Sequence, residues 1–275
     1  MATLHVVATP IGNLEDVTLR ALRVLGEAAL VLAEDTRRTR VLLERHGVRA
    51  KPLSLHAHNE AARVARVLET LEAGGDVALV SDAGTPLVSD PGARLVAAVL
   101  AAGHDVTAVP GPSALLAALV VADIPAERFS FVGFLPRRKG ARDALLASLR
   151  ARPEALVFFE APRRVAATLR ALAGAFGSRA ACVARELTKL HEEAARGRLD
   201  ALAERFADGA RGEVTIVVAG AGEAPAADAA DLEAAIRARL EAGDTPRAVA
   251  AALAKRWGVP KRDVYARALA LRAAH

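Results

Sequence analysis

The run from Val77 to Gly92 reads VALVSDAGTPLVSDPG and decides the fold class. Its first four residues are apolar, as in a buried strand, and the segment after Ser81 is rich in the glycine and proline that form tight elbows. Ligands of open α/β sheets bind where the strands end. Glycine permits close backbone approach and proline fixes the next bend. The run therefore predicts either a simple tight turn or a site where a small polar ligand meets the backbone at Gly84–Val88.

A second Gly/Pro elbow, Pro110-Gly111-Pro112-Ser113-Ala114, also follows an apolar run and begins a helical pattern. Its hydroxyl and amide groups should face the same sheet edge as the first elbow. Two such elbows on neighbouring strands predict one pocket.

Outward from these elbows, short β-rich runs alternate with helical patterns, which is the rhythm of α/β architecture. We expect helices that begin at Asn59, at Asp90-Pro91 and, with several arginines around an apolar seam of Val41 and Leu42, at Thr36. The expected strands are 4–8, 29–33, 77–81, 106–110, 129–134, 156–159, 182–185 and 214–219.

The organisation along the 275 residues predicts two α/β domains and a small helical module. One break falls near Asp123-Ile124-Pro125, and the small, turn-rich stretch 219–228 is typical of a linker. We expect an N-terminal α/β domain over 1–123, a C-terminal α/β domain over 124–220, and three short helices over 228–275. This tail carries a net charge of +3, which suits either a nucleic-acid-binding module or a packing appendage.

Composition excludes several classes of protein. The longest apolar run, Ala114–Ala122, is nine residues, too short to cross a membrane. Met1 leads directly into an apolar strand pattern without a signal sequence, so we expect a cytoplasmic location. The single cysteine, Cys182, forbids an internal disulfide and is expected to be a small buried hydrophobe.

The chain lacks a dinucleotide-binding glycine motif, a P-loop, a zincin motif and a nucleophile elbow. His56, His58 and Glu60 have metal-like types and alternate along one face, but solvent or structural hydrogen bonds explain them equally well, and we expect no metal. The net charge of +5, supplied mostly by arginine, makes a polyanionic partner plausible. Biased codon usage is the competing explanation for the arginines.

At the two elbows the sequence resembles the tetrapyrrole methylase superfamily and, more narrowly, the ribosomal RNA small subunit methyltransferase I family. The resemblance covers about residues 4–220. One departure is Arg163-Arg164, where that family often reads His-Arg. The remaining segments that carry the resemblance are 8–16 (ATPIGNLED), 34–37 (EDTR), 56–60 (HAHNE), 133–136 (GFLP), 159–162 (FEAP) and 185–189 (RELTK).

The resemblance implies a homodimer that binds S-adenosylmethionine in a cleft between the two α/β domains. It implies that the methionine end lies at the first elbow, that the second elbow also contacts the cofactor, and that Pro10 faces the acceptor. The second domain would supply the adenosine pocket. The cofactor-binding residues it suggests are Pro10, Gly84, Thr85, Pro86, Leu87, Val88, Ser113, Ala114, Phe159, Glu213 and Val214.

Methyl transfer to a ribose 2′-hydroxyl, the reaction of this family, is an in-line displacement that needs a positioned and deprotonated oxygen. Glu34 and Asp35 are candidate general bases or orienting groups, with capping of the Thr36 helix as the alternative. Lys189 is a candidate to polarise the hydroxyl or to hold a phosphate. Its alternative is a surface ion pair with Glu192 or Glu193.

The expected partner is 16S ribosomal RNA, in the assembled small subunit, at a cytidine of the decoding region. Few aromatic residues are available for stacking, so recognition should depend on RNA shape and phosphate contacts. A C-methyltransferase of tetrapyrrole precursors and a non-catalytic assembly factor are the competing interpretations. The expected phosphate-binding residues are Arg37, Arg38, Arg40, Arg137, Arg138, Lys139, Arg142, Arg163 and Arg164.

Overall fold

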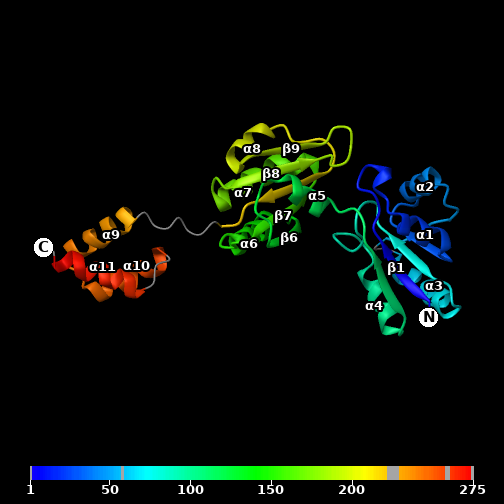
Figure 1. Cartoon of the computed structure of the whole chain (residues 1–275), viewed down its shortest axis with the longest axis horizontal. Helices are drawn as coiled ribbons and strands as arrows, with labels where there is room; N and C mark the ends of the chain where they lie inside the picture. Colours follow the sequence, from blue (N-terminus) through cyan, green and yellow to red (C-terminus); the bar gives the residue numbers. More distant parts are fainter. Residues whose placement is uncertain (1, 57–58, 222–228, 258–260, 274–275) are drawn as a thin grey trace. The chain divides into compact units, whose positions relative to one another are not determined.

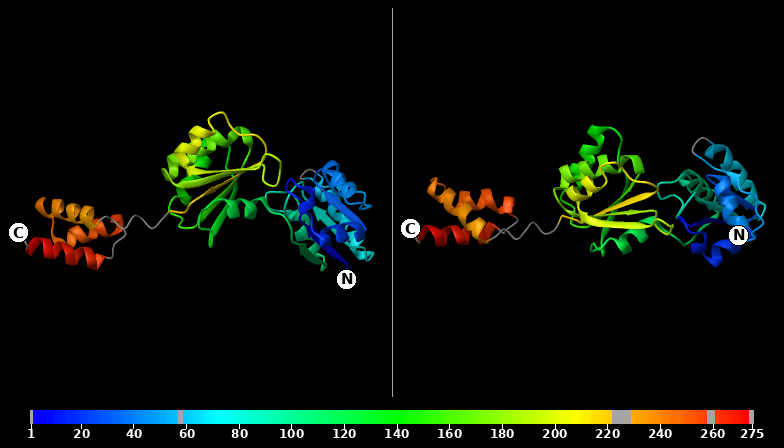
Figure 2. Two further views of the ribbon diagram at one scale, coloured as in Figure 1. Left: turned by 45° about the horizontal axis from the view of Figure 1, so that its top comes forward. Right: turned by 90° about the horizontal axis from the view of Figure 1, so that it is seen from above.

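The computed structural model describes residues 2–56, 59–221, 229–257 and 261–273 (Figure 1). The chain divides into two compact units, Met1–Leu149 with Ala155–Ala219, and Arg150–Glu154 with Gly220–His275. The first unit contains two five-stranded sheets, and the described part of the second consists of helices (Figure 2). The predicted α/β class with C-terminal helices is confirmed.

The N-terminal sheet is parallel throughout, in the order β3-β2-β4-β1-β5. Because all strands run the same way, the loops that follow them gather at one edge, where ligands of such sheets bind. The strands are β1 (Thr3–Val7), β2 (Leu30–Ala33), β3 (Leu53–Ser54), β4 (Val77–Val80) and β5 (Asp105–Val109).

Helices cover both faces of this sheet. On β4, Val77 and Leu79 belong to one hydrophobic cluster, whereas Ala78 and Val80 belong to another on the opposite face. The first cluster includes residues of α3 (Glu60–Glu72) and α4 (Ala93–Ala101), and the second includes residues of α1 (Leu19–Glu27) and α2 (Thr36–Arg45). A short 3-10 turn, η1 (Leu14–Asp16), precedes α1. Burial on both faces explains why β2 and β4 are apolar throughout.

The start of α4 corrects one prediction. The helix begins at Ala93 with Gly92 as its N-cap, not at Asp90-Pro91. A residue distant in the sequence provides an acceptor for a backbone N–H group of its first turn. The Leu95 N–H donates to the buried carboxylate of Glu60 on α3, at 3.1 Å. A carboxylate at a helix N-terminus satisfies free N–H groups and favours the helix dipole. The side chain of Asp90 therefore does not cap α4.

The second sheet is mixed, in the order β6-β7-β10-β8-β9, and only β6 and β7 are parallel neighbours. Four of its strands match predicted runs. No sequence pattern predicted β9, whose residues EAARGR lack apolar alternation, or the two-residue β3 of the N-terminal sheet. The strands are β6 (Phe129–Phe134), β7 (Ala155–Glu160), β8 (Ala180–Arg185), β9 (Glu193–Arg198) and β10 (Val214–Val218).

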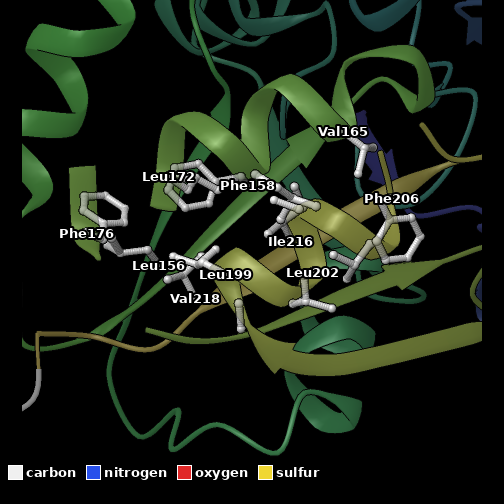
Figure 3. Packing of buried hydrophobic residues seen from close by; sticks show 14 of the residues in the cluster. Leu156, Phe158, Val165, Leu172, Phe176, Leu199, Leu202, Phe206, Ile216 and Val218 are labelled. Atoms are coloured by element: carbon white, nitrogen blue, oxygen red, sulfur yellow. The ribbon is translucent and has the colours of Figure 1, made fainter. Parts of the chain in front are cut away.

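Alternation along these strands separates two cores. Leu156 and Phe158 of β7 face the helices α6 (Lys139–Leu149), α7 (Val165–Phe176) and α8 (Leu199–Arg205), whereas Val157 packs with α5 (Ala114–Val121) on the other face. Figure 3 shows Phe158 and Ile216 packed with side chains of α7 and α8. Each such side chain contributes roughly 1.5–3 kcal/mol when fully buried. The turn η2 (Pro162–Arg164) connects β7 to α7.

The second unit contains α9 (Ala229–Glu241), α10 (Pro246–Trp257) and α11 (Lys261–Ala273). They share a small core, as the helical pattern of the tail predicted. Most of the linker predicted over 219–228 lies outside the described residues. The core comprises Leu232, Ile236, Val249, Ala250, Leu253, Val264 and Ala268.

Two further observations bear on the exclusions made from sequence. Within the described ranges, each helix falls short of the length and apolar character that a membrane span requires. Cys182 is fully buried in the core between β8 and α5, as expected of a small hydrophobe.

Candidate active site

The first elbow is fixed to the loop after β1. The Thr9 N–H donates to the Gly84 carbonyl at 2.8 Å, and the Gly84 N–H donates to the Thr9 carbonyl at 2.9 Å. Gly84 has φ +76°, which glycine adopts without strain, and Leu87 and Ser89 are held at φ +72° and +73°. Non-glycine residues rarely adopt such angles, so the elbow has a defined and partly strained shape.

The two elbows meet, as the sequence predicted, but they do not follow neighbouring strands, because β1 lies between β4 and β5. A Cβ built on Gly84 would lie 3.7 Å from the Pro112 carbonyl oxygen and 3.4 Å from Ile11. Ser113 caps α5, with its Oγ accepting the Leu116 N–H at 3.4 Å. Residues of both elbows line one cavity of about 360 Å³, which we call the elbow cavity. That volume is in the range of small-molecule sites.

The second sheet completes the elbow cavity. Phe134 and Phe159 come from β6 and β7, with ring centroids 5.9 Å apart, and Glu213 and Val214 come from the start of β10. Eight of the eleven suggested cofactor-binding residues line it, which are Gly84, Thr85, Val88, Ser113, Ala114, Phe159, Glu213 and Val214. Pro86 and Leu87 do not, and Leu87 packs against the N-terminal core instead.

Asp90 lines the elbow cavity and was not expected there. Burial, together with the negative charges of Glu34 and Asp82, raises the pKa of Asp90 to about 6, although a hydrogen bond with Ser81 opposes this shift. An acidic side chain within a Gly/Pro elbow was a possible signal of a site residue. Asp90 was instead predicted to begin a helix, because an Asp-Pro pair is also typical of a helix N-terminus.

A second cavity, of about 350 Å³, borders the first. We call it the Lys189 cavity. Pro10, the eleventh suggested cofactor residue, lines this cavity, together with Arg38, Asp82 and Lys189. Three residues line both cavities, namely Ile11, Ala83 and Glu213. Of these three, only Glu213 has a carboxylate, a side chain that can accept a hydrogen bond from a hydroxyl.

Lys189 joins the two halves of the first unit. Its Nζ lies 2.9 Å from Glu186 Oε1 and 3.1 Å from Glu213 Oε2, so the expected alternative partners, Glu192 and Glu193, are wrong. Burial lowers the pKa of Lys189, but the hydrogen bonds with the two carboxylates outweigh burial and raise it overall. The ammonium is therefore a fixed positive charge and a hydrogen-bond donor, not a base.

The loop after β1 packs against this segment. The Asn13 N–H donates to Thr188 Oγ1 at 3.1 Å, and a side chain at Gly12 would collide with Lys189. Glu186 and Thr188 both have positive φ, at +51° and +67°. The turn that carries Lys189 is thus held in an uncommon conformation against the N-terminal sheet.

Glu34 and Asp35 follow β2 and line neither cavity. Asp35 is the N-cap of α2, where its Oδ1 accepts the Arg37 N–H at 2.9 Å. Hydrogen bonds with Arg37 hold the pKa of Asp35 at about 2, so it is a weak base. Burial, and then the charge of Asp82, raises the pKa of Glu34. The geometry thus gives Asp35 the capping role that was its alternative.

The basic residues expected to bind phosphate lie mostly at the surface. Arg37 pairs with Asp35, Arg38 lies 3.8 Å from Asp82, and Arg164 pairs with the buried carboxylate of Glu160. Lys139 and Arg142 both pair with Asp143. Among the nine, Arg38 is the one that lines a cavity. Those with exposed side chains and no ion pair within the described structure are Arg40, Arg137, Arg138 and Arg163.

The metal-like residues 56–60 have structural partners where they are described. The Glu60 carboxylate accepts the Leu95 N–H, and the His56 N–H donates to Asn59 Oδ1 at 2.8 Å. His58 lies outside the described residues. Elsewhere in the described ranges, no three His, Cys, Asp or Glu side chains gather in a way that would hold a metal ion.

A parallel sheet and a mixed sheet with two adjoining cavities place this chain in a known class of enzymes. The family model of Tetrapyrrole (Corrin/Porphyrin) Methylases matches residues 3–203, so the chain belongs to this family. The fold agrees. Uroporphyrin-III C-methyltransferase from Thermus thermophilus has a TM-score of 0.59 and 21% identity, covering 80% of this chain and 94% of that one. Diphthine synthase also has a TM-score of 0.59, with 16% identity, covering 80% and 90%.

Relatives with similar sequences show to which branch of this family the chain belongs. The ribosomal RNA small subunit methyltransferase I of Mesorhizobium japonicum is 46% identical over 274 residues, covering 98% of this chain and 92% of that protein. The protein of the same name from Mycobacterium tuberculosis is 47% identical over 265 residues, covering 94% and 91%. Within the tetrapyrrole methylases, the chain belongs to the ribosomal RNA small subunit methyltransferase I family.

Proposed function

We propose that the chain transfers a methyl group from S-adenosylmethionine to the ribose 2′-hydroxyl of a cytidine in the decoding region of 16S ribosomal RNA. The substrate is the assembled small subunit, and the reaction takes place in the cytoplasm. The observation that carries the proposal is the pair of adjoining cavities that share Glu213. One suits a small amphipathic cofactor, and the other is lined by Arg38 and Lys189 beside the carboxylates of Asp82 and Glu213. The names of the relatives support ribosomal RNA as the substrate.

The residues of the elbow cavity fit the cofactor. Its apolar wall, with Phe134, Phe159 and Val214, suits a nucleoside base, and the bare backbone at Gly84 admits a close polar contact. The carboxylates of Asp90 and Glu213 match a cationic ligand. When bound, S-adenosylmethionine supplies a methyl group on a positively charged sulfur.

The border between the cavities provides groups to handle the hydroxyl. Glu213 lines both cavities with a mostly exposed carboxylate, which can accept the hydroxyl proton. Lys189 holds that carboxylate at 3.1 Å and Glu186 at 2.9 Å, which leaves one of its three donors for the hydroxyl oxygen or a neighbouring phosphate. Glu34 and Asp35 stay near the end of β2 and shape the local field through Asp82, whose Oδ1 accepts the Asp35 N–H at 2.7 Å.

Exposed arginines provide the electrostatic contacts to RNA. Arg137 and Arg138 precede α6, Arg163 lies on η2, and Arg37 and Arg40 lie on α2. Arginine binds phosphate with a planar pair of donors, and such contacts position RNA without reading its sequence. These charges account for a basic protein with few aromatic side chains.

We also propose a homodimer. Helix α5 is apolar throughout, and while Ala118 and Leu119 pack on the second sheet, Val120 is 85% exposed and Leu116 53% exposed. An exposed apolar helix face in a cytoplasmic protein is typical of an interface. A Val120→Glu substitution should shift the sedimentation coefficient toward that of a monomer. A wild-type chain that sediments as a monomer contradicts the proposal.

The function is tested by deleting the gene and analysing the ribosomal RNA by mass spectrometry. We expect one 2′-O-methylcytidine of 16S RNA to disappear and to return with the wild-type gene. An unchanged methylation pattern would exclude the proposed substrate. Transfer of labelled methyl groups to purified small subunits, compared with free 16S RNA, distinguishes the assembled particle from the naked RNA as the substrate.

A further inference from the structure

Helix α2 leaves one apolar side chain without a packing partner in the hydrophobic core. The sequence suggested a seam of Val41 and Leu42, and Leu42 is buried at 3% exposure, but Val41 is 55% exposed. Val41 lines the Lys189 cavity together with Leu14 and Pro10. An apolar wall in an open cavity next to charged groups is the composition of a site that binds a flat, polar-edged ligand.

Two side chains of opposite charge, Arg38 and Asp82, line the same cavity. Arg38 Nε lies 3.8 Å from Asp82 Oδ2, which is longer than a hydrogen bond, while Asp82 Oδ1 is occupied by the Asp35 N–H at 2.7 Å. Within the described contacts, one carboxylate oxygen and the guanidinium therefore retain hydrogen-bonding capacity. Together they present an acceptor next to donors, which is the complement of a base edge with an amine donor beside a ring-nitrogen acceptor.

The cavity also opens to the place where the proposed reaction occurs. Ile11, Ala83 and Glu213 line both cavities, so a ligand in the Lys189 cavity borders the elbow cavity. A nucleotide stacked in folded RNA cannot enter such a cavity, whereas a nucleotide turned out of its stack can. A ribose at the border then places its hydroxyl near Glu213.

We propose that the Lys189 cavity receives a flipped-out cytidine, whose base lies against Val41 and Leu14 and whose amine donates to Asp82 while Arg38 donates to the adjacent ring nitrogen, N3. This inference rests on the proposed function for the identity of the polymer. Uracil has an oxygen in place of the amine, which would face the Asp82 carboxylate, so the cavity selects cytosine over uracil. The site thereby distinguishes one base from another, which the phosphate contacts do not.

The experiment uses the full-length protein without cofactor or RNA and titrates it with cytidine 5′-monophosphate or uridine 5′-monophosphate, followed by NMR. We expect the wild type to bind the cytidine nucleotide about tenfold more tightly than the uridine nucleotide. Val41→Trp fills the cavity and should weaken cytidine nucleotide binding at least about tenfold. The matched control is Leu19→Trp, because Leu19 is apolar, 87% exposed and lines neither cavity.

Asp82→Asn tests the base selection. The asparagine Oδ1 still accepts the Asp35 N–H, but its amide group cannot accept from the cytosine amine, so the preference for cytidine should disappear. Affinity for S-adenosylmethionine, measured by calorimetry, should stay unchanged in Val41→Trp and shows that the protein is folded.

Equal wild-type binding of the two nucleotides, no binding at millimolar concentration, or unimpaired binding by Val41→Trp would overturn the proposal. Failure of the proposed function has a different signature, which is a wild-type protein that transfers no methyl group to small subunits whatever its nucleotide binding.

Discussion

The two cavities differ in the way the chain builds them. The elbow cavity takes residues from the loops of both sheets, has two aromatic rings and holds a half-buried carboxylate. The Lys189 cavity is built mostly by the loops of the N-terminal sheet and by α2, and the second sheet contributes only Lys189 and Glu213. A small cofactor is best enclosed from two sides, whereas a large polyanion needs an open, cationic entrance. Substitutions in the two cavities should therefore separate cofactor binding from the acceptor step.

The largest effect is expected at the border that the cavities share. Glu213→Gln keeps the size of the side chain but removes the proton acceptor, so methyl transfer to small subunits should fall roughly 100-fold to 10,000-fold. Cofactor affinity by calorimetry should fall much less than methyl transfer, because Asp90 also lines the elbow cavity. Glu192→Gln is the matched control, because Glu192 accepts the Thr188 N–H nearby and lines neither cavity. Full activity of Glu213→Gln would assign the proton to solvent or to another group.

The next effect belongs to the elbow cavity alone. Gly84→Val places a branched side chain at φ +76° and against Ile11 and the Pro112 carbonyl, and this should lower cofactor affinity about 100-fold or more. Gly103→Val is the control. Gly103 has φ +81° with open space around it, so this variant carries the same backbone strain without touching the site. Equal losses of affinity in both variants would show that strain, not the elbow, is responsible.

Much of the fold and the position of the elbow cavity could be predicted from the sequence. Apolar runs followed by glycine and proline predicted the α/β class and both elbows, because β4 is buried on both faces and the first elbow needs positive φ angles. Strand β9 could not be predicted, since its polar residues form a strand only by pairing with β8. Local patterns do not report such long-range pairing.

The Lys189 cavity was harder to predict because its contacts are distant in sequence. The partner of Lys189 among the downstream residues is Glu213, 24 positions on, not its near neighbours Glu192 and Glu193. Asp90 was misassigned for the same reason, because Glu60, 35 positions before Leu95, takes over the expected role at the start of α4. The exposure of Val41 also depends on what its helix packs against.

The exposed arginines that are proposed to contact RNA provide a third, smaller effect. Changing Arg37, Arg137 and Arg138 together to glutamine should weaken RNA binding and reduce the slope of log affinity against log salt by roughly 2, at about 0.7–0.9 for each lost phosphate contact. Cofactor affinity should stay unchanged.

A matched triple variant, in which Arg23, Arg94 and Arg170 become glutamine, controls for net charge. These arginines are exposed on α1, α4 and α7, and none lines either of the two cavities. If the two triple variants lose the same slope, the arginines act only through total charge, and the proposed contacts are wrong.

The smallest effect concerns the carboxylate that distinguishes the elbow cavity, and its sign follows from the pKa of Asp90. That pKa is raised from 3.8 to about 6 in the folded protein, so the folded state binds more protons than the unfolded state between these values. Stability should therefore decline as pH rises through this window, and Asp90→Asn should remove the decline.

A cationic ligand beside Asp90 favours the ionised form and lowers its pKa again. Affinity for S-adenosylmethionine should consequently rise severalfold from pH 5 to pH 7 in the wild type, with release of a proton, and should be flatter in Asp90→Asn. Calorimetry in two buffers of different ionisation enthalpy measures both quantities. A wild-type affinity that is independent of pH, or the same pH profile in both proteins, would place the positive charge of the cofactor away from Asp90 and against Glu213.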